Sequence, residues 1–98
     1  MEEIINVPGI DGTIIGPYDL SGSMGMPGEF EKPVVKEALA RYIDICKAHH
    51  FPMGFHVGNA DSAKIQEKIE EGYRFIAYGT DFLFMGDTAA KGMKELRK

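Results

Sequence analysis

Short apolar runs alternate along the chain with segments of helical periodicity. The runs are "GTIIG" (12–16), "MGFHV" (53–57) and "YRFIAYG" (73–79). Apolar runs without polar alternation are typical of strands covered on both faces, as in a parallel sheet. We therefore predict parallel strands at these three positions.

The clearest helical spacing lies between Pro33 and His50, where apolar side chains recur on one face and charged side chains fill the other. Pro33 suits the first turn of a helix, and Pro52 lies just past its end. The first residues, "EEIINVPG", are interpreted as a final helical turn and a loop that lead into the first strand.

Two further helices follow the later runs. One is predicted from Asp61 or Ser62, as the N-cap, to Gly72 as the residue that ends it. The other is predicted from near Asp87 or Thr88 to the C-terminus, although Gly92 interrupts it at about 1 kcal/mol relative to alanine. The resulting order, (α)-βα-βα-βα, predicts an α/β fold in one domain over residues 1–98.

Composition excludes several classes of protein. Eleven basic residues are scattered among fifteen acids, and the net charge is −4, so no cationic surface for nucleic acid is expected. No apolar run approaches the roughly 18 residues of a membrane span. The acidic start "MEEIIN" is unlike a secretory signal, so a cytoplasmic location is expected. A single cysteine, Cys46, cannot form an internal disulfide.

The stretch "GPYDLS" (16–21) directly follows the first predicted strand. Functional groups of α/β folds gather at the carboxyl ends of strands. There Gly16 allows close backbone approach, Pro17 stiffens the turn, and Asp19 can project a carboxylate. Backbone N–H groups of residues 18–20 can hold an anion. The alternative is a plain turn in which Asp19 or Ser21 caps a short helix.

The run from "EEI" through "VPGIDG" and "GPYDLS" to "KPVV" resembles the second half of the HpcH/HpaI aldolase family, and the later "GTD" (79–81) extends the likeness over essentially the whole chain. This family comprises metal-dependent pyruvate aldolases, among them 4-hydroxy-2-oxoheptanedioate and 2-dehydro-3-deoxyglucarate aldolases. The resemblance implies a partial (β/α)8 TIM barrel whose three βα units correspond to strands six to eight. A complete barrel needs roughly 250 residues.

The resemblance also implies reversible aldol chemistry, in which a divalent metal (Mg, Mn or Co) chelates pyruvate and stabilises its enolate while an aldehyde is released or added. Asp19 corresponds to one metal carboxylate. The N–H groups of Tyr18 and Asp19 correspond to the seat of the pyruvate carboxylate, with Gly16 and Pro17 beside them. The family's second metal carboxylate, its catalytic His and its Arg have no counterpart in these residues, so no catalytic residue is assigned here.

Other side chains leave alternatives open. His56, at the end of the second predicted strand, could contact the acceptor aldehyde or simply pack. Asp81 could complete the rim of a pocket or cap the next turn. Cys46 is predicted to be core, and His49 and His50 to be structural at a helix C-terminus. The apolar side chains of Phe82, Phe84 and Met85 are predicted to pack against a subunit or helix.

Two classes of function follow. The first is a pyruvate aldolase in which this chain is inactive alone and needs a complementing N-terminal half-barrel. The second is a truncated, non-catalytic α/β module that acts through oligomerisation or partner binding. Because a three-strand arc would leave Ile14, Phe55 and Ile76 without partners on its inner face, we expect a homo-oligomer or a complementing partner.

Overall fold

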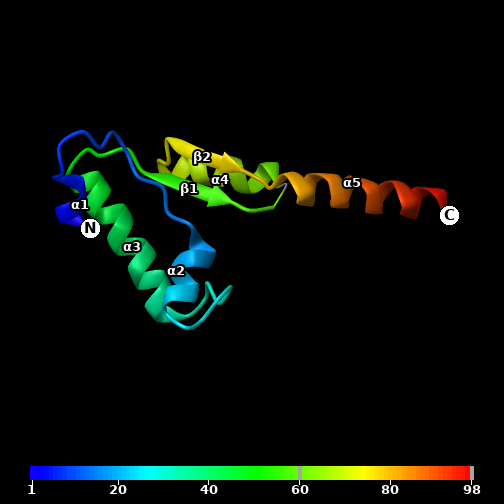
Figure 1. Cartoon of the computed structure of the whole chain (residues 1–98), viewed down its shortest axis with the longest axis horizontal. Helices are drawn as coiled ribbons and strands as arrows, with labels where there is room; N and C mark the ends of the chain where they lie inside the picture. Colours follow the sequence, from blue (N-terminus) through cyan, green and yellow to red (C-terminus); the bar gives the residue numbers. More distant parts are fainter. Residues whose placement is uncertain (60, 98) are drawn as a thin grey trace.

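The structure is a computed structural model that describes residues 1–59 and 61–97. Within them the chain forms five helices and two strands, and its extents are 55 × 27 × 22 Å (Figure 1). The elements in order are α1 (Glu2–Ile5), α2 (Pro17–Ser23), α3 (Pro33–Ala48), β1 (Gly54–Val57), α4 (Ser62–Glu71), β2 (Phe75–Tyr78) and α5 (Asp81–Leu96). None of these helices is both long and apolar enough to cross a membrane.

The two strands pair in parallel, with Gly54 opposite Phe75 and Val57 opposite Tyr78. Helix α4 connects them, as a parallel pair requires. The predicted α/β class with a parallel sheet is therefore confirmed.

The prediction that residues 12–16 form the first strand is wrong. The segment runs beside β1, but it forms a single parallel bridge between Ile15 and Phe55. The N–H of Ile15 donates to the carbonyl of Gly54 at 2.9 Å, and the N–H of His56 donates to the carbonyl of Ile15 at 3.2 Å. The run is short because Gly12 and Gly16 bound it and α2 begins at Pro17.

The core lies between the sheet and α3. It consists of Tyr42, Cys46, Met53, Phe55, Val57 and Tyr73, and Ile15 and Ile76 pack against it. The prediction that Phe55 and Ile76 lie without partners on the inner face of the sheet is therefore wrong. The register places these two side chains opposite each other, on the face that the core covers. Side chains alternate along a strand, so the opposite face carries Ile14, Gly54, His56, Phe75 and Ala77. We call this set the open face, and Ile14 and Phe75 are 46% and 61% exposed on it.

Helix α3 confirms the predicted helix and ends at Ala48. The N–H of Phe51 donates to the carbonyl of Cys46 at 2.8 Å, and the N–H of His50 donates to that of Lys47 at 3.2 Å. These two bonds form a Schellman motif, which needs a left-handed residue. That residue is His50, with φ +51°. A side chain there costs about 1 kcal/mol that glycine avoids.

Helix α4 confirms its prediction at both ends. The carboxylate of Asp61 accepts hydrogen bonds from the N–H groups of Ala63 and Lys64 at 3.1 and 3.2 Å. Gly72 ends the helix in the left-handed conformation, with φ +103°. Helix α1 likewise matches the predicted turn at the start of the chain.

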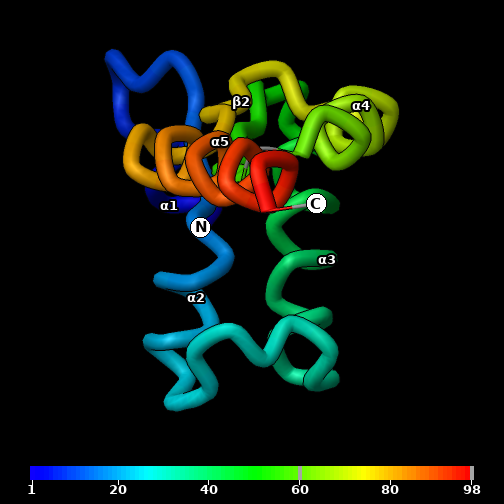
Figure 2. The backbone as a smooth tube through the Cα atoms, turned by 90° about the vertical axis from the view of Figure 1, so that its right-hand side faces the viewer, coloured from blue at the N-terminus to red at the C-terminus, as the bar shows by residue number. Residues whose placement is uncertain are grey.

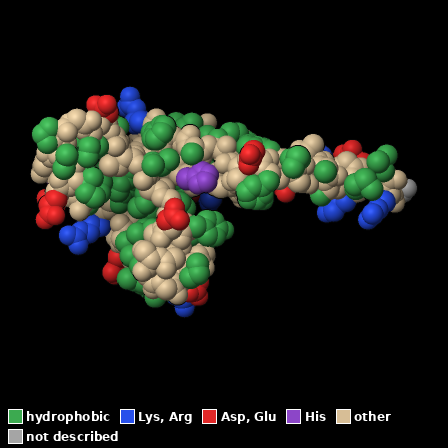
Figure 3. All heavy atoms as spheres, in the orientation of Figure 1, with side chains coloured by type: hydrophobic (Ala, Val, Ile, Leu, Met, Phe, Trp, Pro, Cys, Tyr) green, Lys and Arg blue, Asp and Glu red, His purple; other side chains and the backbone are tan. Residues whose placement is uncertain are grey.

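Helix α5 begins at Asp81, six residues before Asp87. The predicted start of this helix is therefore wrong. Gly92 does not interrupt it, because a glycine in a helix interior lowers stability by only about 1 kcal/mol. The helix projects from the end of β2 as an arm, whereas α2 and α3 lie side by side (Figures 1 and 2). It buries no residue, and hydrophobic, acidic and basic side chains are all visible along it (Figure 3).

Candidate functional site

The five predicted site residues line one hollow at the carboxyl end of β1. Gly16, Pro17, Tyr18, Asp19 and His56 all border it, and its volume is about 760 Å³. We call it the front hollow. It brings together the end of the 12–16 segment, the first turn of α2 and the end of β1, which lie far apart in the sequence.

The "GPYDLS" stretch forms the start of α2 rather than an isolated turn. Gly16 is the N-cap in an extended conformation, and Pro17 occupies the first helical position, where its fixed φ is favourable. Neither Asp19 nor Ser21 caps the helix, so that part of the alternative is wrong. The N–H groups of Tyr18 and Asp19 belong to the first turn, where the helix supplies no partner for them.

The carboxylate of Asp19 lies close to the backbone of Gly16. A Cβ atom added to Gly16 would be 2.8 Å from Asp19 Oδ2. Gly16 therefore allows the close approach that the sequence predicts, and the approaching group is Asp19 itself. The carboxylate is solvent-exposed and lies in the first turn of α2.

Ser21 attaches α2 to the loop that follows it, a role that the sequence did not indicate. Its side chain is fully buried, donates to the carbonyl of Tyr18 at 3.2 Å, and accepts from the N–H of Gly28 at 3.0 Å. The rings of Tyr18 and Phe30 meet edge to face with centroids 5.0 Å apart. The 24–32 loop is thus attached to the helix that carries Asp19.

His56 is half-buried and connects the ends of the two strands. Its Nε2 lies 3.2 Å from the carbonyl oxygen of Gly79. A carbonyl accepts only, so this contact assigns the ring proton to Nε2 and leaves Nδ1 as an acceptor. Thr80, which also borders the front hollow, donates from Oγ1 to the carbonyl of Gly58 at 2.9 Å. Both polar side chains are therefore held at the rim.

Three lysines also border the front hollow, and sequence reasoning missed them. Each is paired with an acid: Lys36 with Glu31 at 2.6 Å, Lys64 with Glu67 at 3.3 Å, and Lys68 with Glu71 at 3.2 Å. The hydrogen bond and charge of Lys36 lower the pKa of Glu31. Lys68 also lies over the Phe55 ring, 4.4 Å from its centroid. Two of these pairs, Lys64–Glu67 and Lys68–Glu71, could have been predicted from the sequence, because their members are three residues apart on a helix.

A divalent cation would find one candidate ligand among the predicted residues, the carboxylate of Asp19. Within residues 1–59 and 61–97, no group of three or more His, Cys, Asp or Glu side chains is arranged to hold a metal ion. Hard cations take about six oxygen ligands. The described residues therefore do not form a metal site by themselves.

The remaining candidates take structural positions. Cys46 is fully buried in the core, as predicted. His49 caps α3, and its Nε2 lies 3.9 Å from a carboxylate oxygen of Glu2. Asp81 accepts from the N–H of Phe82 at 2.8 Å in the first turn of α5. The N-cap of that helix is Thr80, so Asp81 does not cap it, and Asp81 does not line the front hollow either. Phe84 packs edge to face against Tyr78 of β2, with ring centroids 5.3 Å apart, whereas Phe82 and Met85 are exposed. Their packing against a subunit or helix stays a prediction.

Known proteins resemble this chain in sequence and in fold. The sequence profile of the family described as HpcH/HpaI aldolase/citrate lyase matches residues 1–86. The chain is 30% identical over 97 residues to a hydroxypyruvate/pyruvate aldolase of Paraburkholderia phytofirmans, covering 99% of this chain and 36% of that protein. It is 36% identical over 87 residues to a 2-keto-3-deoxy-L-rhamnonate aldolase of Escherichia coli, covering 89% and 32% respectively.

Two crystal structures are similar over almost the whole chain. A HpcH/HpaI aldolase/citrate lyase family protein from Burkholderia cenocepacia matches with a TM-score of 0.88, and a HpcH/HpaI aldolase from Desulfitobacterium hafniense with 0.84. Both are 30% identical and are covered over 37% of their length, with 99% of this chain aligned. The chain shares its fold with the corresponding part of these two structures. The chain belongs to the HpcH/HpaI aldolase/citrate lyase family, and it spans about a third of the length of its relatives.

Proposed function

We propose that this chain is part of a metal-dependent carbon–carbon lyase, an aldolase. The enzyme would cleave 2-keto-3-deoxy or 4-hydroxy-2-oxo acids into pyruvate and an aldehyde, or form those acids from them. The observation that carries the proposal is the position of "GPYDLS" in a chain of this family: its acid and first-turn N–H groups border the front hollow together with His56.

Asp19 is the proposed metal carboxylate, as one ligand of a site that needs others. The ion pairs of the hollow support this role, because each of its three lysines is paired with an acid other than Asp19. A bound Mg, Mn or Co ion would supply Lewis-acid stabilisation of the negative charge that develops on the keto oxygen of pyruvate. The exposed carboxylate is available for such an ion.

The first turn of α2 is the proposed seat of the pyruvate carboxylate. The N–H groups of Tyr18 and Asp19 have no partner within the helix, and Pro17 at the first position has no N–H. Gly16, as the N-cap, keeps the approach to these groups free of a side chain. The backbone would thereby orient pyruvate beside Asp19.

His56 is the proposed contact for the acceptor aldehyde. With its Nε2 proton donated to Gly79, its Nδ1 is an acceptor for a substrate hydroxyl. One relative is named for 2-keto-3-deoxy-L-rhamnonate, which is a hydroxylated compound. A hydroxylated aldehyde is therefore the proposed substrate class.

The chain is proposed to be one partial-barrel domain, with its three βα segments in the place of strands six to eight. The open face supports this, because a barrel interior would cover the exposed Ile14 and Phe75. The complementing strands come from an N-terminal half-barrel, which would also supply the missing metal ligand, base and cation. The same exposed side chains, together with the lack of a three-ligand cluster among the described residues, support the second candidate, a non-catalytic module that oligomerises.

One experiment separates the two candidates. The 98-residue chain and a protein that joins it to the N-terminal part of the Paraburkholderia relative are assayed for pyruvate release with Mg²⁺ or Mn²⁺. We expect no turnover above background from the chain alone and metal-dependent turnover from the joined protein. Robust turnover by the chain alone, or an inactive but folded joined protein, would contradict the proposal.

A further inference from the structure

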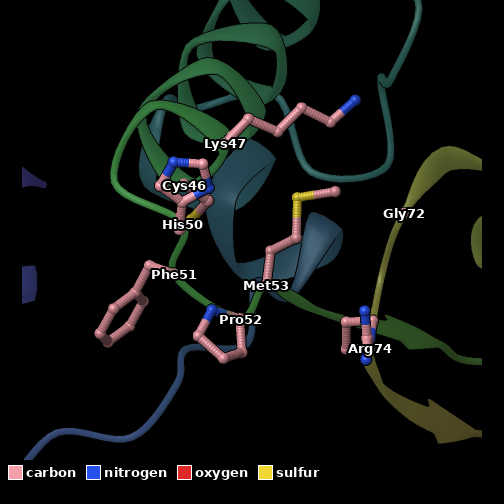
Figure 4. Close-up of a pocket in the computed structure, with 8 residues that line it drawn as sticks. All are labelled: Cys46, Lys47, His50, Phe51, Pro52, Met53, Gly72 and Arg74. Atoms are coloured by element: carbon pink, nitrogen blue, oxygen red, sulfur yellow. The ribbon is translucent and has the colours of Figure 1, made fainter.

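A second pocket lies at the other end of the strands, where β1 and β2 begin. Its volume is about 660 Å³, and its walls include Lys47, His50, Phe51, Pro52, Met53 and Arg74 (Figure 4). We call it the rear pocket. It is formed by the end of α3, the segment before β1 and the segment before β2.

The rear pocket gathers basic side chains that have no acidic partner. Among the residues that the structure describes, no carboxylate oxygen lies within 4.0 Å of the side-chain nitrogens of Lys47, His50 or Arg74. In contrast, each lysine of the front hollow is ion-paired. The exposed cations of Lys47 and Arg74 therefore stand without an ion pair among the described residues and are available to an anion.

The carbonyl groups at the end of α3 repel an anion in this pocket less strongly than those of a free helix C-terminus would. Two of its last carbonyls, those of Cys46 and Lys47, already accept hydrogen bonds from Phe51 and His50 at 2.8 and 3.2 Å. The carbonyl of Met53 likewise accepts from the N–H of Arg74 at 3.0 Å. These three carbonyls are therefore already occupied by backbone donors.

The floor of the rear pocket is apolar. Met53 is 3% exposed and lies between Lys47 and Arg74, with Pro52 beside it (Figure 4). The basic groups therefore stand around an apolar centre instead of converging on one point. This arrangement suits a small organic molecule that has a carbon frame and more than one negative group.

His50 provides an independent observation. It holds the left-handed conformation that the end of α3 requires, with φ +51°, although glycine would hold it without strain. Non-glycine residues in this conformation persist where the surrounding structure imposes them, and they cluster at ligand sites. Here the strained residue borders the pocket with its imidazole.

We propose that the rear pocket binds a small organic polyanion, a di- or tricarboxylate or a phosphorylated metabolite. Lys47 and Arg74 donate charge-assisted hydrogen bonds to its anionic groups, His50 adds a third donor, and Met53 and Pro52 contact its carbon frame. The site does not depend on the aldolase assignment, since it uses none of the residues of the front hollow.

The test measures binding of citrate and of inorganic phosphate to the 98-residue chain by isothermal titration calorimetry at constant ionic strength. We expect citrate to bind with a Kd of about 1 mM or tighter. Lys47→Met and Arg74→Met, which keep the apolar stems, should each weaken binding about tenfold because a charge-assisted hydrogen bond is lost. Lys91→Met, which removes the same charge from α5, should change it less than about twofold.

His50→Gly distinguishes a binding role from a structural one. Relief of the left-handed strain should raise the thermal midpoint, while loss of the imidazole should weaken citrate binding severalfold. Tighter binding of phosphate than citrate would assign the site to phosphorylated ligands. The proposal is overturned if neither anion binds, or if the Lys47, Arg74 and Lys91 variants all bind as the parent does.

Discussion

The hydroxyl of Tyr42 accepts a hydrogen bond from the backbone N–H of Gly54 at 3.0 Å, joining α3 to the first residue of β1. The same hydroxyl lies 2.7 Å from Thr13 Oγ1 and 3.3 Å from the carbonyl oxygen of Gly54. One buried side chain thus holds together the helix, the strand and the 12–16 segment that leads to Asp19. Two predictions concern this junction.

Tyr42→Phe should lower the free energy of unfolding by about 1–3 kcal/mol, because the N–H of Gly54 would remain buried without its partner. Urea unfolding measures the change. Tyr78→Phe is the matched control, since Tyr78 is 47% exposed and its loss of a hydroxyl should change stability by less than about 0.5 kcal/mol. Equal effects of the two substitutions would show that the Tyr42 hydroxyl does not stabilise the junction.

Gly54→Ala should be more damaging, because the strands approach each other closely at this residue. A Cβ atom there would lie 2.5 Å from the carbonyl oxygen of Thr13 and 2.8 Å from that of Phe75. Backbone atoms on both sides cannot move apart without breaking the pairing, so we expect a loss of about 2–3 kcal/mol. Gly86→Ala is the control: nothing lies within 4 Å, and its helical position should gain up to about 1 kcal/mol. A stable Gly54→Ala variant would refute the close approach.

The helices could be predicted largely from the sequence, because their determinants are local. Pro33, Asp61 and Gly72 each act on their own turn, and all three take the predicted position. The strand count and the faces could not. Whether 12–16 becomes a strand depends on a neighbour on its far side, and which face Phe55 occupies depends on the register with Ile76.

The candidate site divides in the same way. A local motif found Gly16 to Asp19, and the end of an apolar run found His56, and these five predicted residues do meet in the front hollow. The three lysines and Ser21 were missed because their contacts come from the packing of α3, α4 and the 24–32 loop. The rear pocket was missed because an internal helix end, not a motif, forms it.

Stability should fall at alkaline pH because of two buried phenols. Burial raises the pKa of Tyr42, and burial together with the charge of Glu71 raises the pKa of Tyr73 well above its usual range. A phenol whose pKa is raised by folding stabilises the protein fully below its unfolded pKa, near 10, and loses that contribution as the pH rises above it.

Unfolding in urea between pH 8 and pH 11 tests this, and the free energy of unfolding should decline above a pH of about 10. Tyr73→Phe should reduce the decline, whereas Tyr18→Phe should not, because Tyr18 is 64% exposed. A decline of the same slope in all three proteins would assign it to other groups.

His56→Leu should alter the choice of aldehyde in a protein that carries the complete barrel. Leucine fills the volume but lacks the acceptor, so hydroxylated aldehydes should lose about 1–3 kcal/mol of transition-state binding relative to aldehydes without the hydroxyl. The measurement is the ratio of kcat/KM for the two kinds of aldehyde, with metal affinity as a second readout that should stay constant. His49→Leu, outside the front hollow, is the control. Identical ratios in the variant and the parent would leave His56 a structural residue.

Asp19→Asn should abolish turnover in the protein with the complete barrel and should do so through the metal. The amide keeps the shape of the carboxylate over Gly16 but removes the negative charge that attracts a hard cation. Loss of that cation removes several kcal/mol of charge stabilisation, which corresponds to a fall in kcat/KM of about 100-fold or more.

Calorimetric titration of the Asp19→Asn variant with Mn²⁺ should show weakened binding, and its circular dichroism spectrum should not change. Asp87→Asn on α5, which removes the same charge from a residue that does not line the hollow, should keep both activity and metal affinity. Because first-turn N–H groups and not the side chain are proposed to hold pyruvate, Asp19→Asn should retain binding of oxalate measured without metal. An active Asp19→Asn variant with parental Mn²⁺ affinity would remove Asp19 from the metal site.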